Sequence, residues 1–132
     1  MPSARDIHGT VFKNGSAILL ARVVDASGSA VQQADLSAIE YTVYELDPCR
    51  VDSQTAVTGH DGVAVTVADI IYDTLQTGAE WTVDATGYNF RHEVPVSTND
   101  AFPTAGRSYQ IRYELTPTSG EKIIVRFVVK AI

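Results

Sequence analysis

One segment of the chain combines the residue types used in acid–base chemistry. Residues 81–95, WTVDATGYNFRHEVP, contain Asp84, Arg91, His92 and Glu93. A histidine near a carboxylate can act as a general base when both groups share an accessible pocket. Strand alternation instead puts His92 on one face with Phe90 and Val94, and its two charged neighbours on the other face. This pattern favours a structural histidine, so we assign no catalytic residue.

A metal site would require the nitrogen and sulfur donors of the chain to converge. The chain has three histidines and one cysteine: His8, His60, His92 and Cys49. Zinc takes about three or four such ligands, usually at short and regular spacings. These four are scattered, and Cys49 has no second thiol for a disulfide. We therefore predict no metal and no cofactor, and we expect Cys49 to be inert.

Composition narrows the function further. The phosphate-binding, nucleophile-elbow and H-E-x-x-H motifs of common enzymes do not occur, so we predict a protein that is not an enzyme. The net charge of −6 disfavours binding to nucleic acid, which needs clustered basic residues. No apolar run is long enough for a transmembrane helix, and the polar start MPSARDIHGT does not resemble a secretion signal. We expect neither membrane insertion nor secretion.

Charge is unevenly distributed along the chain. Between Arg107 and Lys130 there are five basic and two acidic residues, a local charge of +3 that leaves −9 for the remainder. Such polarity can orient a protein against a charged partner or against copies of itself, and it can equally be a solvated surface. Both interpretations stay open at this point.

Extended strands are the elements that must position these residues, because apolar residues recur with a period of two. Turn residues at Asn14-Gly15, Asp47-Pro48 and Asp61-Gly62 separate the runs, and Asn14-Gly15 predicts a tight hairpin. Residues 69–76 suit a short helical turn. The inward-facing set includes Ile39, Tyr41, Val43, Trp81, Val83, Phe90, Tyr109, Ile111, Tyr113, Leu115, Ile123, Val125, Phe127 and Val129.

The spacing of these runs predicts an all-β fold, an immunoglobulin-like antiparallel β-sandwich of about seven to eight strands. The length of the chain suits one domain, which we place at residues 9–132, after a flexible N-terminal arm at residues 1–8. The last predicted strand alternates apolar and basic residues on its outward face. We therefore predict a partner-contact surface made of Arg112, Ile124, Arg126, Val128 and Lys130.

Two family resemblances follow from longer segments. VVDASGSAVQQADL, GHDGVAV and WTVDATGYNF resemble the turn pattern of transthyretin-like modules. IIYDTLQTGAEWTVDATGYNFRHEVP and AFPTAGRSYQIRYELTPTSGEKIIVRF resemble small single-domain immunoglobulin-like proteins of phages and prophages. The second resemblance spans about residues 16–130. It implies a virion role, such as capsid decoration or a tail or baseplate accessory, and it carries over no catalytic residues.

We therefore expect a non-enzymatic phage virion protein that binds other capsid or tail proteins, after assembly in the host cytoplasm. Association with copies of itself stays open. The alternative is a glycan- or ligand-binding adhesion module, in which rings stack on a sugar. It would use Tyr44, Tyr72, Trp81 and Tyr88. That alternative requires several of these rings to lie exposed on one surface.

Overall fold

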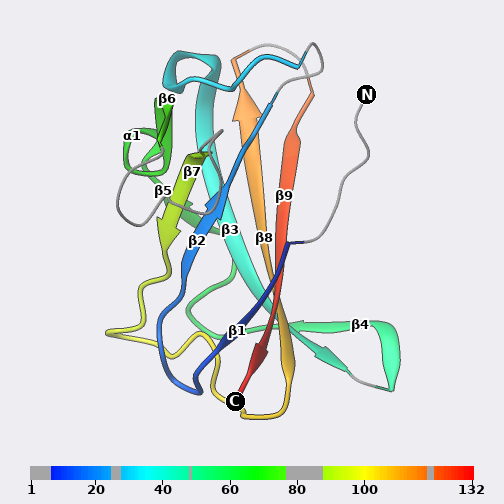
Figure 1. Ribbon diagram of the computed structural model, residues 1–132. Helices are drawn as coiled ribbons and strands as arrows, with labels where there is room; N and C mark the ends of the chain where they lie inside the picture. The colour runs from blue at the N-terminus through cyan, green and yellow to red at the C-terminus, as the bar shows by residue number, and fades with distance from the viewer. Residues whose placement is uncertain (1–6, 25–27, 48, 77–87, 119–120) are drawn as a thin grey trace.

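The computed structural model is a sandwich of two β-sheets (Figure 1). It describes residues 7–24, 28–47, 49–76, 88–118 and 121–132. The prediction of an all-β sandwich is confirmed. The strands are β1 (Ile7–Val11), β2 (Ile18–Ala21), β3 (Leu36–Asp47), β4 (Arg50–Ala56), β5 (Val63–Val65), β6 (Ile71–Gln76), β7 (Tyr88–Glu93), β8 (Ser108–Pro117) and β9 (Ile123–Ala131). The helical pieces are η1 (Gln33–Asp35) and α1 (Val67–Ile70).

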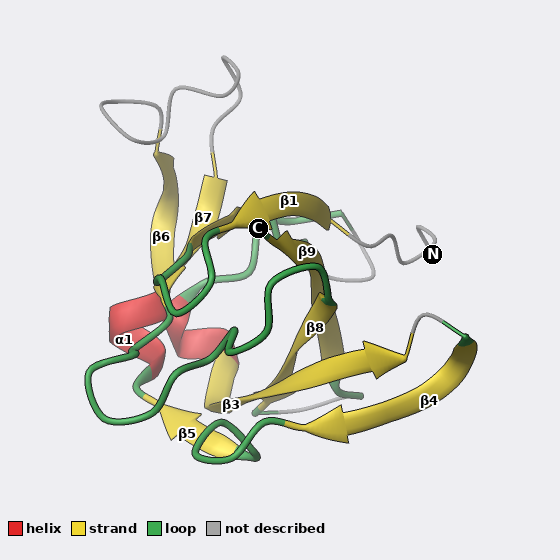
Figure 2. Ribbon diagram, turned by 90° about the horizontal axis from the view of Figure 1, so that it is seen from below, coloured by secondary structure: helices red, strands yellow, loops and turns green. Residues whose placement is uncertain are grey.

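The large sheet has the order β1-β9-β8-β3-β4, with β5 also paired to β3, and the small sheet has the order β2-β7-β6. Variable-type immunoglobulin domains distribute their strands in this way, with the last two strands next to the third on one sheet and the second strand on the other. Figure 2 shows β4 extending away from the rest of the sandwich, whereas α1 lies beside β6 at the opposite side.

The hairpin expected at Asn14-Gly15 is wrong, although Asn14 does take a positive φ of 60°. β1 pairs with β9 and β2 pairs with β7, so the two strands belong to different sheets. The β1–β9 pair is also parallel, whereas we expected antiparallel pairing throughout. The turn carries the chain across the sandwich, because Val11 and Leu19 fill the shared core from opposite sheets.

Two boundaries and one whole strand differ from the sequence prediction. The helical turn occupies Val67–Ile70, and Ile71–Gln76 form β6 instead. β4 was missed because RVDSQTA is mostly polar, which suits a strand at the edge of the large sheet. The ordered strand β1 begins at Ile7, inside the predicted arm.

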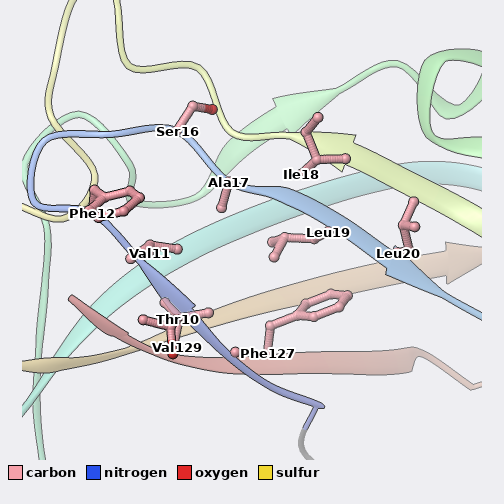
Figure 3. Close-up of a pocket in the computed structure, with 11 residues that line it drawn as sticks. Thr10, Val11, Phe12, Ser16, Ala17, Ile18, Leu19, Leu20, Phe127 and Val129 are labelled. Atoms are coloured by element: carbon pink, nitrogen blue, oxygen red, sulfur yellow. The ribbon is translucent and has the colours of Figure 1, made fainter. Parts of the chain in front are cut away.

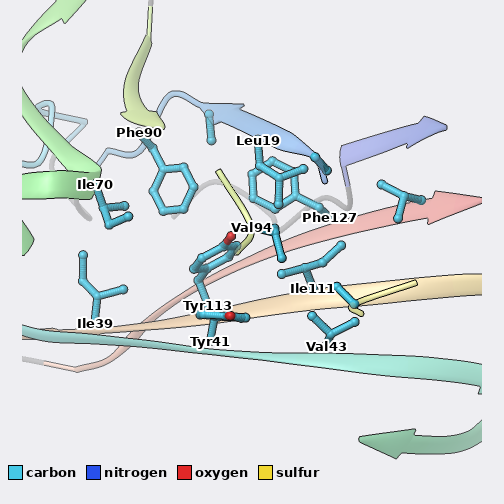
Figure 4. Packing of buried hydrophobic residues seen from close by; sticks show 14 of the residues in the cluster. Leu19, Ile39, Tyr41, Val43, Ile70, Phe90, Val94, Ile111, Tyr113 and Phe127 are labelled. Carbon is cyan, nitrogen blue, oxygen red and sulfur yellow. The ribbon is translucent and has the colours of Figure 1, made fainter. Parts of the chain in front are cut away.

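The core forms where the inward faces of the two sheets meet (Figure 4). β8 shows the pattern most clearly, because every second residue from Tyr109 to Leu115 is buried. Phe90 of β7 packs edge-on against Tyr113 of β8, with ring centroids 4.8 Å apart, and so joins the small sheet to the large one. Of the predicted core residues, Trp81 and Val83 lie outside the described part of the chain.

A buried amide on β7 holds the segment that follows β2. Asn89 of β7 is fully buried and accepts a hydrogen bond from the Val23 amide at 2.7 Å. Its Nδ2 donates to the carbonyl oxygens of Val23 and Val31, at 3.0 and 2.9 Å. The Asn89 side chain therefore replaces a backbone partner for the segment that follows β2.

Candidate functional site

The predicted contact residues lie together on the outer face of the large sheet. Directly opposed residues of an antiparallel pair share a face. Arg112 lies opposite Arg126, Gln110 opposite Val128, Glu114 opposite Ile124 and Ser108 opposite Lys130. We call Arg112, Ile124, Arg126, Val128 and Lys130 the contact face. The structure thus brings all five side chains to one surface, on which Lys130 is exposed and the others are partly exposed.

Like charges lie opposite each other on this surface. Arg112 opposes Arg126 across β8 and β9, and Glu40 opposes Glu114 across β3 and β8. Such pairs destabilise an isolated sheet. Arg112 Nη1 offsets part of this cost through an ion pair with Glu114 Oε1 at 3.2 Å. Lys122 Nζ approaches the other oxygen of Glu114 at 3.9 Å.

Toward β3, the residues beside Arg112 and Val128 on this face are polar and uncharged. Thr42 lies opposite Arg112, and Tyr44 lies opposite Gln110. Thr42, Tyr44 and Gln110 are partly exposed, as are the aliphatic side chains Ile124 and Val128. Ile124 and Val128 flank Arg126 along β9, so an apolar group of a partner could cover them while a carboxylate pairs with the arginine.

His92 lies inside the sandwich, on the same face as Phe90 and Val94, as alternation predicts. Its Nδ1 is 2.5 Å from the hydroxyl oxygen of Tyr113. The His92 ring also packs against Tyr41, with centroids 5.1 Å apart. The hydrogen bond with Tyr113 explains why an ionisable ring shares a face with apolar side chains, because the Tyr113 hydroxyl is its polar partner.

His60 also contacts the Tyr41 ring, with centroids 5.9 Å apart, so the two histidines and two tyrosines form one buried group. We call His60, Tyr41, His92 and Tyr113 the histidine–tyrosine cluster. His60 Nε2 is 2.8 Å from the Asn99 carbonyl oxygen, which can only accept a hydrogen bond. Nε2 therefore carries the proton, and His60 Nδ1 accepts from the Tyr41 hydroxyl at 2.8 Å.

A local excursion of the chain places His60 in the core. The Val43 amide donates to the His60 carbonyl, while the Val43 carbonyl accepts from the Val57 amide, each at 2.8 Å. Both ends of residues 57–60 are thus held by the same residue of β3. Gly59 makes the turn with a φ of +85°, and a Cβ there would lie 2.4 Å from the Asn99 side chain. Only glycine fits this position without strain.

Burial controls the ionisation of three members of the cluster, His92, Tyr41 and Tyr113. Desolvation, followed by the nearby positive charge of Arg91 and by His60, lowers the pKa of His92 to about 4. Burial raises the pKa of Tyr41, and burial together with Tyr41 raises the pKa of Tyr113 well above its usual value. At neutral pH His92, Tyr41 and Tyr113 are therefore uncharged, and all four side chains of the cluster are at most 7% exposed. Such a group supports the core, because no substrate can reach it in this conformation.

The sequence did not predict the histidine–tyrosine cluster as a whole. Alternation placed Tyr41, His92 and Tyr113 inside, but His60 belongs to the turn sequence GHDG and its inward position depends on the loop. The other polar candidates do not join the cluster. Arg91 and Glu93 alternate with the inward residues, and Asp84 lies outside the described residues.

The other predicted donors are also dispersed. Cys49 is exposed at the turn between β3 and β4, where its amide donates to Asp47 Oδ1 at 2.8 Å. Within the described residues, no group of three or more histidine, cysteine or acidic side chains is arranged to hold a metal ion. The described helices are also too short to span a membrane.

The rings proposed for glycan stacking lie on different sheets. Tyr44 is on β3 of the large sheet, whereas Tyr72 and Tyr88 are on β6 and β7 of the small sheet. The Arg22 guanidinium lies 5.2 Å from the centroid of the Tyr88 ring. Trp81 is outside the described residues. The three described rings therefore offer no single stacking surface.

Searches against protein-family profiles, curated protein sequences and solved structures gave no match for this chain.

Proposed function

We propose that this chain is a non-enzymatic structural protein that binds other proteins through the contact face. We further propose that it is a component of a phage virion. The observation that carries the binding role is the arrangement of Arg112 opposite Arg126, flanked by Ile124 and Val128. Arg112, Arg126 and Lys130 outnumber the Glu114 carboxylate that pairs with Arg112, and this excess of positive charge favours an acidic partner. The resemblance to small immunoglobulin-like phage proteins supports the virion setting.

The partner expected from this surface carries carboxylates next to small apolar groups. Carboxylates would pair with the two arginines, and aliphatic side chains would cover Ile124 and Val128. Because the whole chain has a net charge of −6, a uniformly acidic partner would be repelled elsewhere. The contact face therefore favours a defined orientation of the chain on its partner.

The virion role is tested on phage particles purified from cells that carry the gene for this chain. Particles are separated on a density gradient and their proteins are quantified by mass spectrometry. We expect the chain to sediment with capsids or tails in a fixed ratio to a major structural protein. Absence from intact particles would contradict the virion role.

The contact face is tested with single charge reversals in the same particles. Arg126→Glu and Lys130→Glu should each reduce incorporation at least about tenfold, because each places a carboxylate against an acidic partner. Arg50→Glu is the matched control, since Arg50 is exposed on β4 and its reversal changes the net charge equally. If Arg126→Glu and Lys130→Glu were incorporated as well as the control Arg50→Glu, the partner would bind elsewhere.

A further inference from the structure

A second surface, distinct from the contact face, combines a protruding ring with a groove. Phe12, Ile18 and Ile132 are 73%, 49% and 56% exposed and are the exposed large hydrophobic residues among those the structure describes. They belong to one region of the surface. The Ile132 amide donates to the Val11 carbonyl and the Ile132 carbonyl accepts from the Lys13 amide, each at 2.9 Å, and Ile18 lines the same groove as Phe12. Clustered exposed apolar side chains mark an interaction surface more often than scattered ones do.

The groove lies between β1 and β2, where the two sheets separate (Figure 3). It has a volume of about 330 Å³ and is lined by residues 9–12, residues 16–20, Phe127 and Val129. β1 is the end strand of the large sheet and β2 is the end strand of the small sheet. Among the described residues, neither sheet has a further strand on the side where the groove opens.

Phe12 and the groove form a self-complementary pair. Phe12 lines the groove, yet almost three quarters of it is exposed. A two-fold axis brings identical patches together, so a residue that inserts into the partner's groove receives the same residue in its own. We propose that this surface binds a second copy of the chain, with Phe12 of each copy inserted into the groove of the other.

Charge complementarity supports a second copy as the occupant. Lys13 follows Phe12, and Glu93 lies opposite Ile18 on β7. Both are exposed, and neither has an ion-pair partner among the described residues. When Phe12 of one copy enters the groove beside Ile18 of the other, Lys13 comes close to Glu93 of the other copy. The two-fold axis forms this pair twice.

The ring insertion is tested by sedimentation velocity over a series of protein concentrations. The wild-type chain should dimerise, and Phe12→Asp should shift the dissociation constant upward at least about a hundredfold, because it places a charge in an apolar groove. Ala68→Asp is the control, since Ala68 is exposed on α1, away from the groove. A wild-type chain that stays monomeric, or a Phe12→Asp chain that dimerises like the wild type, would overturn the proposal.

A charge exchange tests the geometry without touching the apolar groups. Lys13→Glu and Glu93→Lys should each weaken dimerisation, because each opposes two like charges across both symmetric contacts. The double variant Lys13→Glu/Glu93→Lys should regain most of the wild-type affinity. Failure of the double variant to recover would contradict this arrangement. Arg126→Glu should leave dimerisation unchanged, which separates this surface from the contact face.

Discussion

His92 shows how a single buried residue couples the stability of this protein to pH. The native pKa of about 4 lies below the value of about 6.5 expected for the unfolded chain. The unfolded state therefore binds more protons below pH 6.5, and stability is lost as the pH falls from about 6.5 to about 4. The stabilisation that depends on neutral His92 is fully present above about pH 6.5.

We predict that the low pKa of His92 lowers the free energy of unfolding by about 2 kcal/mol when the pH falls from about 7 to about 5. Urea unfolding at both pH values measures this loss. His92→Gln should lower stability at pH 7, because the Tyr113 hydroxyl loses its ring partner, but its pH dependence should be smaller by the same amount. Equal pH dependence of the wild type and the variant would refute the burial of a neutral His92.

At the level of elements, the loop of residues 57–60 controls the position of His60. Val43 of β3 holds both ends of the loop, and Gly59 lets it turn close to Asn99. The Asn99 carbonyl in turn accepts a hydrogen bond from His60 Nε2–H. A change at Gly59 should therefore be transmitted to the histidine–tyrosine cluster.

Gly59→Ala and Gly62→Ala form a matched pair of variants. Both glycines have a positive φ, +85° and +64°, but a Cβ at Gly62 would have no atom within 4 Å. We expect a loss of about 1 kcal/mol for Gly62→Ala from the backbone strain alone, and at least about 1 kcal/mol more for Gly59→Ala. Thermal or urea unfolding measures both. Equal losses would mean that Asn99 moves aside freely.

At the level of the whole molecule, the two sheets share one core and should unfold together. Phe90 of the small sheet contacts Tyr113 and Phe127 of the large sheet, with centroids 4.8 and 5.8 Å away. Phe90→Ala should cost about 3–5 kcal/mol, because it removes a fully buried ring. Ile124→Ala, on the partly exposed outer face, should cost much less.

Cooperativity is the measurement that separates one unit from two. Far-ultraviolet circular dichroism follows the strands, and near-ultraviolet circular dichroism follows the packed tyrosines. Both signals should change at one midpoint in the wild type, and both should shift equally in Phe90→Ala. Separate midpoints would show that the sheets are stabilised independently.

The sequence by itself determined the fold class and most of the strand faces. Period-two alternation placed Tyr41, His92 and Tyr113 inside and Arg112 and Arg126 on one outer face, because side-chain direction in a strand depends only on local geometry. Tertiary structure alone decided which strands pair. The Asn14-Gly15 turn permits a hairpin, yet β1 joins the large sheet and β2 joins the small one, and the groove beside Phe12 lies between them. The inward position of His60 was also decided by tertiary structure, since it depends on hydrogen bonds to residues far away in the chain.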